Sequence, residues 1–357
     1  MKKELDFKYP FWQWGGLGFY NCYAAVYMYL QGLNNEAIGC NAKKGNDCNS
    51  CSDCSEKIVN LFETIAGQTT VRQSYSGEKT KIQNELEAEL GNSSNSSDKL
   101  VDFIIGFTGY DYSKVTGEIT ESVTSSIDIG KPVLAKLKND NWAGDAAKGY
   151  RIITGYDGDV FLGPDYSPAA DLLLSPSCDE IKCIYVFGEQ TSPKHTFLDL
   201  LIFMERVMGS DFSEGIWYDF LHKFDYEGEK LWEVDVAEIK SRFKRFSDVS
   251  GWLSCMSHSL QNAFGDRKLL EDLGANIEKI DDLLKVIGHQ THLLHNHGYQ
   301  ANALWDSVNA FQMDDNEKWP WDKNGLITTA SLVLNAIIEC DMKILIAVKK
   351  AIRKLSH

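Results

Sequence analysis

The stretch that decides the fold reads GKPVLAK (130–136), GYRIITGYDG (149–158) and VFLGPD (160–165). A Gly-Lys-Pro turn signal precedes the first apolar run, the second is rich in β-branched residues, and an Asp-Gly turn separates the second run from the third. A fourth short apolar run follows at 183–187. Short apolar runs bounded by turn residues predict an antiparallel meander of strands.

Helical patterns flank this meander on both sides. Before it, apolar runs at 22–33 and 58–66 predict helices, and helices followed by a meander form an α+β pattern. Beyond a Ser-Pro turn signal at 192–193, apolar residues recur at i, i+3 and i+4 in seven stretches: 197–208, 216–224, 236–246, 252–264, 269–295, 301–311 and 327–355. We therefore expect an α+β domain over 1–190 and an all-α helical domain over 191–357.

Composition restricts the partners of the chain. Of 357 residues, 51 are acidic and 36 are basic, which gives a net charge of −15 at pH 7. This charge repels phosphate backbones and anionic lipid heads, so we expect neither nucleic acid nor a membrane as a partner. Small molecules, peptides or amines, carrier-bound acyl groups and other proteins fit better, and the sequence leaves the oligomeric state open.

Two segments bear on localisation, the N-terminus and the longest apolar stretch. Residues 1–8 are charged and the WQWGG stretch at 12–16 lacks the apolar run of a signal peptide, so we expect a cytoplasmic protein. Polar and charged residues interrupt the longest apolar stretch, at 326–352. This interruption predicts an amphipathic helix rather than a membrane span.

Cys22 opens the first apolar helix, after the glycine and aromatic residues of GFYN at 18–21. A thiol there lies near the positive end of the helix dipole, which lowers its pKa, and nearby backbone N–H groups can hold an oxyanion. The alternative is a core cysteine that fills space between aromatic residues, because free Cys is among the most buried residue types.

Together these motifs resemble the C39-like and butirosin-biosynthesis-H-like branch of the papain-like cysteine peptidase superfamily, over about residues 1–188. In that branch a nucleophilic Cys opens the first long helix, a strand preceded by GKPV follows, a GH-hydrophobic-GYD strand carries the catalytic His, and the next strand ends in an orienting Asp. The resemblance implies a papain-like fold and either amide hydrolysis or acyl transfer from a carrier thioester to an amine. Both reactions pass through an acyl-cysteine.

The resemblance places the nucleophile at Cys22 and the orienting acid at Asp165, with Gln13 as the nearest match to the oxyanion glutamine, but the family's His falls on Tyr150. A phenol with a pKa of about 10 is a poor base at neutral pH. All eight histidines lie at or after His195. Three interpretations remain: a fold that has lost catalysis, a site completed by a His of the helical domain, or a reaction in which Tyr150 donates a proton or hydrogen bond. The rival function is a non-catalytic binding or assembly module.

Four further cysteines crowd into a polar loop at 40–54, namely Cys40, Cys48, Cys51 and Cys54. The two-residue gaps between the last three let their sulfurs converge on one tetrahedral ion. We expect an insertion that holds structural Zn²⁺, ahead of an iron–sulfur cluster, because no Cys-Pro follows and the surroundings are hydrophilic. The alternative is a loop with chance cysteines or labile disulfides.

Histidines gather near the end of the stretch at 269–295, namely His289, His292, His295 and His297. Residues three apart lie on one helix face and can share a metal ion, but no HExxH pattern is present, and a polar helix face is the alternative. We expect His297 to lie past the helix end, before Gly298. The basic residues at 349, 350, 353 and 354 are expected to complement the dipole of the last helix.

Overall fold

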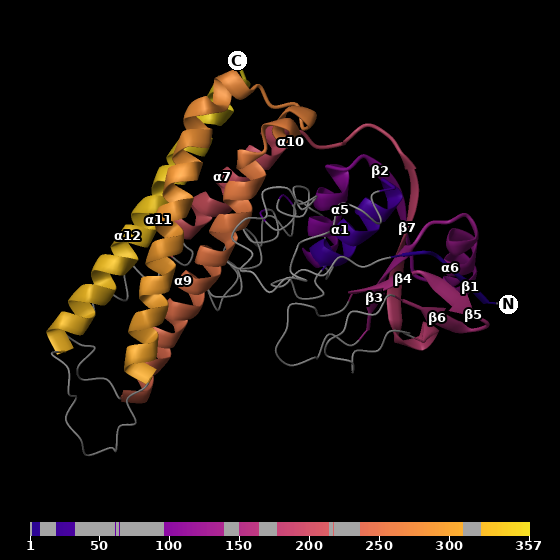
Figure 1. Ribbon diagram of the computed structural model, residues 1–357, viewed down its shortest axis with the longest axis horizontal. Helices are drawn as coiled ribbons and strands as arrows, with labels where there is room; N and C mark the ends of the chain where they lie inside the picture. Colours follow the sequence, from indigo (N-terminus) through magenta and orange to yellow (C-terminus); the bar gives the residue numbers. More distant parts are fainter. Residues whose placement is uncertain are drawn as a thin grey trace, which may run out of the picture. The chain divides into compact units, whose positions relative to one another are not determined.

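The computed structural model describes residues 2–7, 19–32, 61, 64, 96–138, 150–163, 177–213, 217, 236–309 and 323–357. Helices and two antiparallel sheets are present, which confirms the α+β class (Figure 1). The chain forms two compact units, one of residues 1–62 and 100–194 and the other of residues 63–99 and 195–357. No described helix combines the length and the apolarity needed to cross a bilayer.

The larger sheet of the first unit has four antiparallel strands in the order β2-β7-β3-β4. The strands are β2 (Tyr110–Val115), β7 (Ile181–Gln190), β3 (Val133–Leu137) and β4 (Tyr150–Ile153). The predicted strands at 133–137 and 183–187 are confirmed, whereas the strand predicted over 150–155 is divided between β4 and the smaller sheet. The predicted continuous meander is wrong, because β7 pairs with β3 rather than with the strand at 160–162. β2 was not predicted; it follows α5 (Ser96–Gly106) and pairs with β7 at one edge.

The smaller sheet has three strands in the order β1-β5-β6. These are β1 (Lys2–Glu4), β5 (Gly155–Asp157) and β6 (Val160–Leu162). The predicted Asp-Gly turn joins β5 to β6, and Gly158 in this turn has a φ of +59°. Gly155 pairs with Glu4, and a Cβ at Gly155 would lie 2.5 Å from the Lys3 carbonyl oxygen. Glycine at this position therefore allows β1 to approach β5.

Helices cover both faces of the larger sheet. On one face α6 (Ile119–Asp128) packs into a core with Val133 and Ala135 of β3. On the opposite face α1 (Phe19–Leu30) contacts β3 and β4, and Tyr23 of α1 stacks on Phe187 of β7 with ring centroids 5.5 Å apart. Alternate residues of each strand point to opposite faces, so one strand supplies side chains to both layers.

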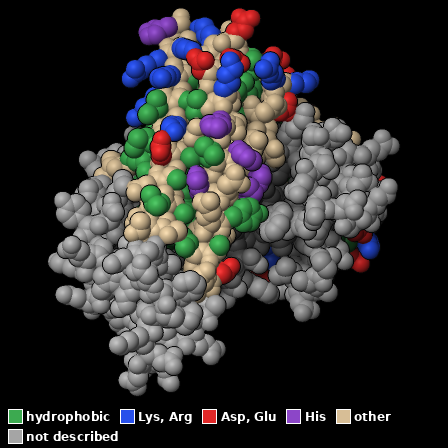
Figure 2. Space-filling view, turned by 60° about the vertical axis from the view of Figure 1, so that its left-hand side comes forward, with side chains coloured by type: hydrophobic (Ala, Val, Ile, Leu, Met, Phe, Trp, Pro, Cys, Tyr) green, Lys and Arg blue, Asp and Glu red, His purple; other side chains and the backbone are tan. Residues whose placement is uncertain are grey.

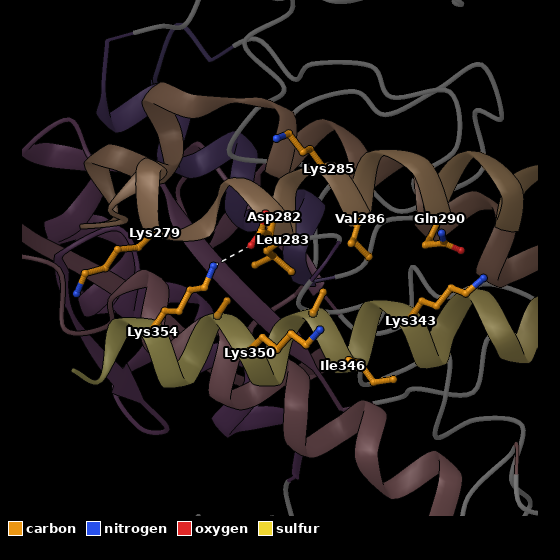
Figure 3. A pocket seen from close by; sticks show the side chains of 12 residues that line it. Lys279, Asp282, Leu283, Lys285, Val286, Gln290, Lys343, Ile346, Lys350 and Lys354 are labelled. Atoms are coloured by element: carbon orange, nitrogen blue, oxygen red, sulfur yellow. Dashed lines mark hydrogen bonds and ion pairs between the residues drawn. The ribbon is translucent and has the colours of Figure 1, made fainter.

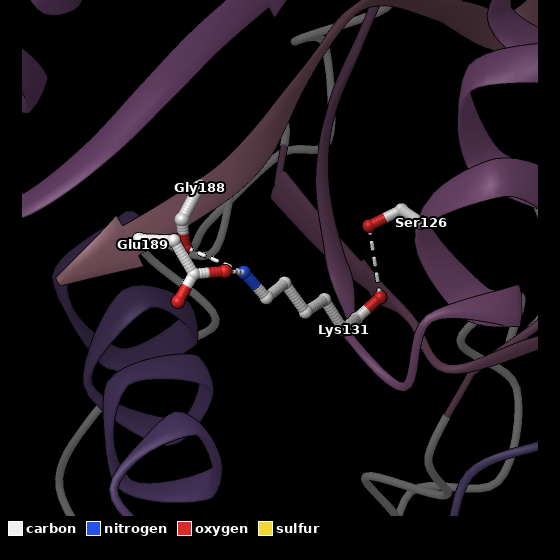
Figure 4. Close-up of polar contacts among 4 residues, drawn as sticks. All are labelled: Ser126, Lys131, Gly188 and Glu189. Atoms are coloured by element: carbon white, nitrogen blue, oxygen red, sulfur yellow. Dashed lines mark hydrogen bonds and ion pairs between the residues drawn. The ribbon is translucent and has the colours of Figure 1, made fainter.

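The turn between α6 and β3 is fastened to β7 (Figure 4). Gly130 has a φ of +83°, a conformation that favours glycine at the predicted Gly-Lys-Pro turn. Next to it, Lys131 Nζ donates to the Gly188 carbonyl oxygen at 2.7 Å and to Glu189 Oε1 at 2.8 Å. Ser126 Oγ of α6 donates to the Lys131 carbonyl oxygen at 3.0 Å. These contacts fix the start of β3 relative to β7.

The described part of the second unit is helical. Its main elements are α7 (Phe197–Ser213), α9 (Val236–Gly265), α10 (Arg267–Asp272), α11 (Ile277–Asn309) and α12 (Lys323–Leu355). α11 packs along both α9 and α12, and α12 also contacts α7. Trp217 is fully buried, and its Nε1 donates to Asp341 Oδ2 of α12 at 2.6 Å.

Several helix boundaries differ from the sequence prediction. The stretches at 236–246 and 252–264 form one helix, α9. The stretch at 269–295 is broken near Gly274, which has a φ of +82°, and α11 then continues to Asn309. The expectation that His297 lies past a helix end is therefore wrong. Gly298 lies inside α11 where a Cβ would be 2.4 Å from Ser254 Cβ, so this glycine allows α9 and α11 to cross closely.

Candidate functional site

Cys22, the predicted nucleophile, lies in the first turn of α1, which begins at Phe19. Its side chain is fully buried, with 0% of its surface exposed. The residues that follow it, from Tyr23 to Val26, are buried as well. The start of α1 is therefore a packed segment of the first unit, and the thiol is not open to solvent.

Burial also sets the acidity of this thiol. It raises the pKa of Cys22 to about 12, while the positive charge of the Arg151 guanidinium acts in the opposite direction. The loss of hydration outweighs the attraction of one nearby cation. At pH 7 a thiol whose pKa is raised this far is almost entirely protonated. Because the thiolate is the reactive form, Cys22 is a poor nucleophile in this setting.

Tyr150 occupies the position where the resemblance implies the catalytic His. It lies on β4, which α1 contacts, so the structure brings the elements of Cys22 and Tyr150 together. Tyr150 pairs across the strands with Lys136, and Lys136 Nζ lies 5.7 Å from the centre of the Tyr150 ring. Arg151 Nη1 donates to the Tyr150 carbonyl oxygen at 2.6 Å. Tyr150, Lys136 and Arg151 are all buried, so none of the three side chains is open to solvent.

The other predicted site residues lie outside the described residues: Asp165, Gln13, Cys40, Cys48, Cys51 and Cys54. Within the ranges that the structure describes, no group of three or more His, Cys, Asp or Glu side chains is arranged to hold a metal ion. The orienting acid, the oxyanion glutamine and the zinc loop therefore stay predictions.

Histidines of the second unit form a contact between two helices. His258 Nε2 of α9 lies 3.2 Å from His295 Nε2 of α11, and the ring centroids are 4.0 Å apart. Desolvation, followed by the neighbouring His295 and His292, lowers the pKa of His258. The sequence analysis considered only histidines within one helix, because the contact of His258 with His295 depends on how α9 and α11 align.

A groove with a volume of about 500 Å³ lies between α11 and α12 (Figure 3). Its apolar lining consists of Leu283, Val286, Ile346, Ala347 and Ala351. Its charged lining consists of five lysines and one acid, namely Lys279, Lys285, Lys343, Lys350, Lys354 and Asp282. The two helices run antiparallel, so Lys279 and Lys354 lie at one end of the groove and Lys343 lies at the other, beside Gln290 (Figure 3).

The lysines of this groove are available to an anion. Three form ion pairs, namely Lys354–Asp282 at 2.8 Å, Lys285–Asp281 at 2.6 Å and Lys343–Glu339 at 2.7 Å. Exposed pairs of this kind contribute at most about 1 kcal/mol, so a bound anion can compete with them. For Lys279 and Lys350 the described residues show no ion pair.

Gln290 adds a hydrogen-bond acceptor to the groove lining. The residue is only 6% exposed, and its buried Oε1 has no hydrogen-bond partner among the described residues. A buried acceptor without a partner costs about 1–3 kcal/mol.

This groove was not predicted from the sequence. The last turn of α12 contains Arg353 and Lys354, as expected for basic residues that complement the helix dipole, and Lys350 and Lys354 also line the groove together with lysines of α11. Figure 2 shows Lys and Arg side chains gathered at the upper end of the helical unit, interspersed with Asp and Glu. The available signal was the recurrence of lysines in two separate stretches, but only the packing of α11 on α12 brings them together.

Comparisons of the chain with protein-family models, with curated proteins and with solved structures give no match. The resemblance to papain-like peptidases therefore stays a prediction. The functional conclusion rests on the geometry of the described residues.

Proposed function

We propose that this chain is a non-catalytic binding protein whose helical unit holds an anionic amphiphile, a molecule with an aliphatic body and a carboxylate or phosphate group. In this proposal the first unit is a papain-like domain in which the nucleophile position has become a core residue. The second unit supplies the binding site in the groove between α11 and α12.

The observation that carries the loss of catalysis is the complete burial of Cys22, with a thiol pKa of about 12. Acyl transfer through a cysteine needs access for the substrate, a thiolate and a base. Burial removes the first two, and a phenol at Tyr150 does not replace the imidazole.

Two features favour the alternative of a cysteine peptidase or acyltransferase. Cys22 lies in the first turn of a helix, and the Arg151 charge lowers its pKa. Desolvation is nevertheless the larger influence on the thiol. We therefore favour binding over catalysis.

The lining of the groove supports the class of ligand. Aliphatic walls favour an alkyl body, and lysines favour a carboxylate or phosphate. The part of α12 from Lys343 to Lys354 is roughly 16 Å long at 1.5 Å per residue, which suits an elongated molecule. Five lysines around one groove are a local departure from a chain whose net charge is −15. This concentration of positive charge is what an anion would recognise.

A calorimetric titration of the full chain tests the binding proposal. The probes are dodecyl phosphate below its micelle concentration, inorganic phosphate, and dodecyltrimethylammonium as a cationic amphiphile. We expect dodecyl phosphate to bind with a Kd on the order of 10 μM, inorganic phosphate at least 100-fold more weakly, and the cation not at all. Equal binding of both amphiphiles would reduce the groove to a non-specific apolar surface. A Kd for dodecyl phosphate of about 1 mM or weaker, which corresponds to a binding free energy of about −4 kcal/mol or less favourable, would contradict the proposal.

The zinc loop at 40–54 is a separate proposal, supported by the spacing of its four cysteines. We expect protein purified without added zinc to contain stoichiometric metal, and the double change Cys48→Ser, Cys51→Ser to remove it and lower the Tm. Metal-free wild-type protein with four titratable thiols in this loop would contradict the proposal.

A further inference from the structure

The contact of His258 with His295 brings two potential ligands of one metal ion together. Their Nε2 atoms lie 3.2 Å apart, across the seam between α9 and α11. Two nitrogens that bind a tetrahedral ion, each at 2.0–2.1 Å, are separated by about 3.3 Å. The two nitrogens therefore already have the spacing that a shared ion requires. The ring centroids lie 4.0 Å apart, closer than the roughly 5 Å of two imidazoles on one tetrahedral ion, so binding also requires the rings to rotate away from each other.

Ser254 of α9 determines which nitrogen of His295 carries the proton. Ser254 Oγ donates to the His295 carbonyl oxygen at 3.1 Å and also lies 2.9 Å from His295 Nδ1. The hydroxyl has one proton, and because the carbonyl oxygen accepts it, Nδ1–H of His295 must donate to Oγ. Neutral His295 then has its lone pair on Nε2, the atom that faces His258. Metal-binding histidines commonly have this arrangement, in which the second nitrogen donates to a fixed acceptor.

The surroundings of the pair are open to solvent but fixed in position. His258 is exposed, and the neighbouring Tyr299, whose ring meets His295 edge-on, is 61% exposed. The backbone below the pair is held by the close crossing at Gly298, where a Cβ would lie 2.4 Å from Ser254 Cβ. An ion can therefore enter from solvent, while the two helices hold the histidines in place.

We propose that His258 and His295 bind a divalent transition-metal ion of the class that prefers imidazole ligands, such as Zn²⁺, Ni²⁺ or Cu²⁺. Because the described residues contain no cluster of three or more ligating side chains, the pair supplies two ligands and water completes the coordination. The exposed His292, one turn before His295 on α11, is close enough to influence His258 electrostatically and is a candidate further donor. This site lies on the α9–α11 seam and is independent of the proposed α11–α12 ligand groove.

Titration of the full chain with Ni²⁺ tests the site, with calorimetry and the Tm as readouts. We expect Ni²⁺ to bind and to raise the Tm, because an ion that joins α9 to α11 binds only the folded state. His258→Gln and His295→Gln should each weaken binding at least 10-fold and remove the rise in Tm. Ser254→Ala, which keeps both imidazoles, should weaken binding about 10-fold by releasing the orientation of His295.

His289→Gln is the matched control, because His289 is an exposed histidine of the same helix outside the pair. The four-cysteine loop is unchanged in every variant, so any metal it holds cancels in the comparison. Unchanged Ni²⁺ binding in His258→Gln and His295→Gln, or an equal loss in His289→Gln, would overturn the proposal. So would a wild-type Tm that does not respond to Ni²⁺, which would leave the pair as a hydrogen bond between helices.

Discussion

The Cys22 region of the first unit and the groove of the second unit differ in how far their charged and reactive side chains are exposed to solvent. In the first unit, the Cys22 thiol and the Arg151 guanidinium that acts on it are both buried, and burial moves the thiol pKa away from the physiological range. Around the groove, ordinary lysines remain at the surface beside an aliphatic lining. A residue type that suggests catalysis in the sequence is therefore a poor guide unless solvent can reach it.

The largest expected difference between the two regions is in how much a truncated side chain lowers the free energy of unfolding. Tyr23 is fully buried, stacks on Phe187 and hydrogen-bonds Thr108 through its hydroxyl. Tyr23→Ala should lower the free energy of unfolding by about 3–5 kcal/mol, because it leaves a large cavity. Ile346→Ala, in the groove lining and 46% exposed, should cost less than about 1 kcal/mol. Hydrogen exchange read by mass spectrometry reports each unit separately, and equal effects would remove the contrast between core and groove.

A smaller effect distinguishes a core thiol from a catalytic thiol. Cys22→Ser places a hydroxyl in a fully buried position, and we expect a loss of about 1–2 kcal/mol in unfolding free energy. Cys178→Ser is the control, since Cys178 is only partly buried, and it should cost less than about 0.5 kcal/mol. Denaturant unfolding measures both. An unchanged stability for Cys22→Ser would return Cys22 to the list of candidate nucleophiles.

The groove should respond to charge rather than to packing. The double change Lys279→Gln, Lys350→Gln should weaken dodecyl phosphate binding about 10-fold, or about 1.4 kcal/mol, with little change in Tm. The double change Lys349→Gln, Arg353→Gln removes the same two charges from residues of α12 that do not line the groove, so it should have less than about a twofold effect. Equal losses in the two proteins would mean that net charge, rather than the groove, controls binding.

The smallest expected effect comes from restoring the histidine of the resemblance. Tyr150→His supplies an imidazole on β4, but a thiol without solvent access gains little from a base. We expect the alkylation rate of Cys22 at pH 7 to change less than about twofold. Cys183, which is also buried, controls for general loosening of the domain. A large increase at Cys22 alone would show that only the missing base prevents catalysis.

Much of the fold could be predicted from local patterns. The strands at 133–137 and 150–153 follow from turn residues and β-branched residues, and the helical second half follows from its apolar spacing. The strand β2 was missed, because Asp, Ser and Lys in its sequence weaken the alternation of apolar residues. Gly298 was misread as a helix end, since its role is to admit Ser254 of another helix.

The sites could be predicted less well, because they depend on distances between elements. The sequence placed Cys22 near a helix start but could not reveal that its side chain is fully buried. It grouped His292 with His295, whereas the close contact of His295 is with His258 of another helix. The groove lysines come from two helices, and only their antiparallel packing makes one site of them.

The alkylation rate of Cys22 against pH, read by peptide mass spectrometry in the folded chain, tests the central claim most directly. Cys178 is the internal reference, because it is partly exposed and lies in the same unit. The account predicts that Cys178 is alkylated at a rate that rises with pH, and that Cys22 stays unreactive through pH 9. Rapid alkylation of Cys22 near pH 6, while Cys178 behaves normally, would show an accessible, stabilised thiolate. That result would contradict the account and identify the first unit as an enzyme.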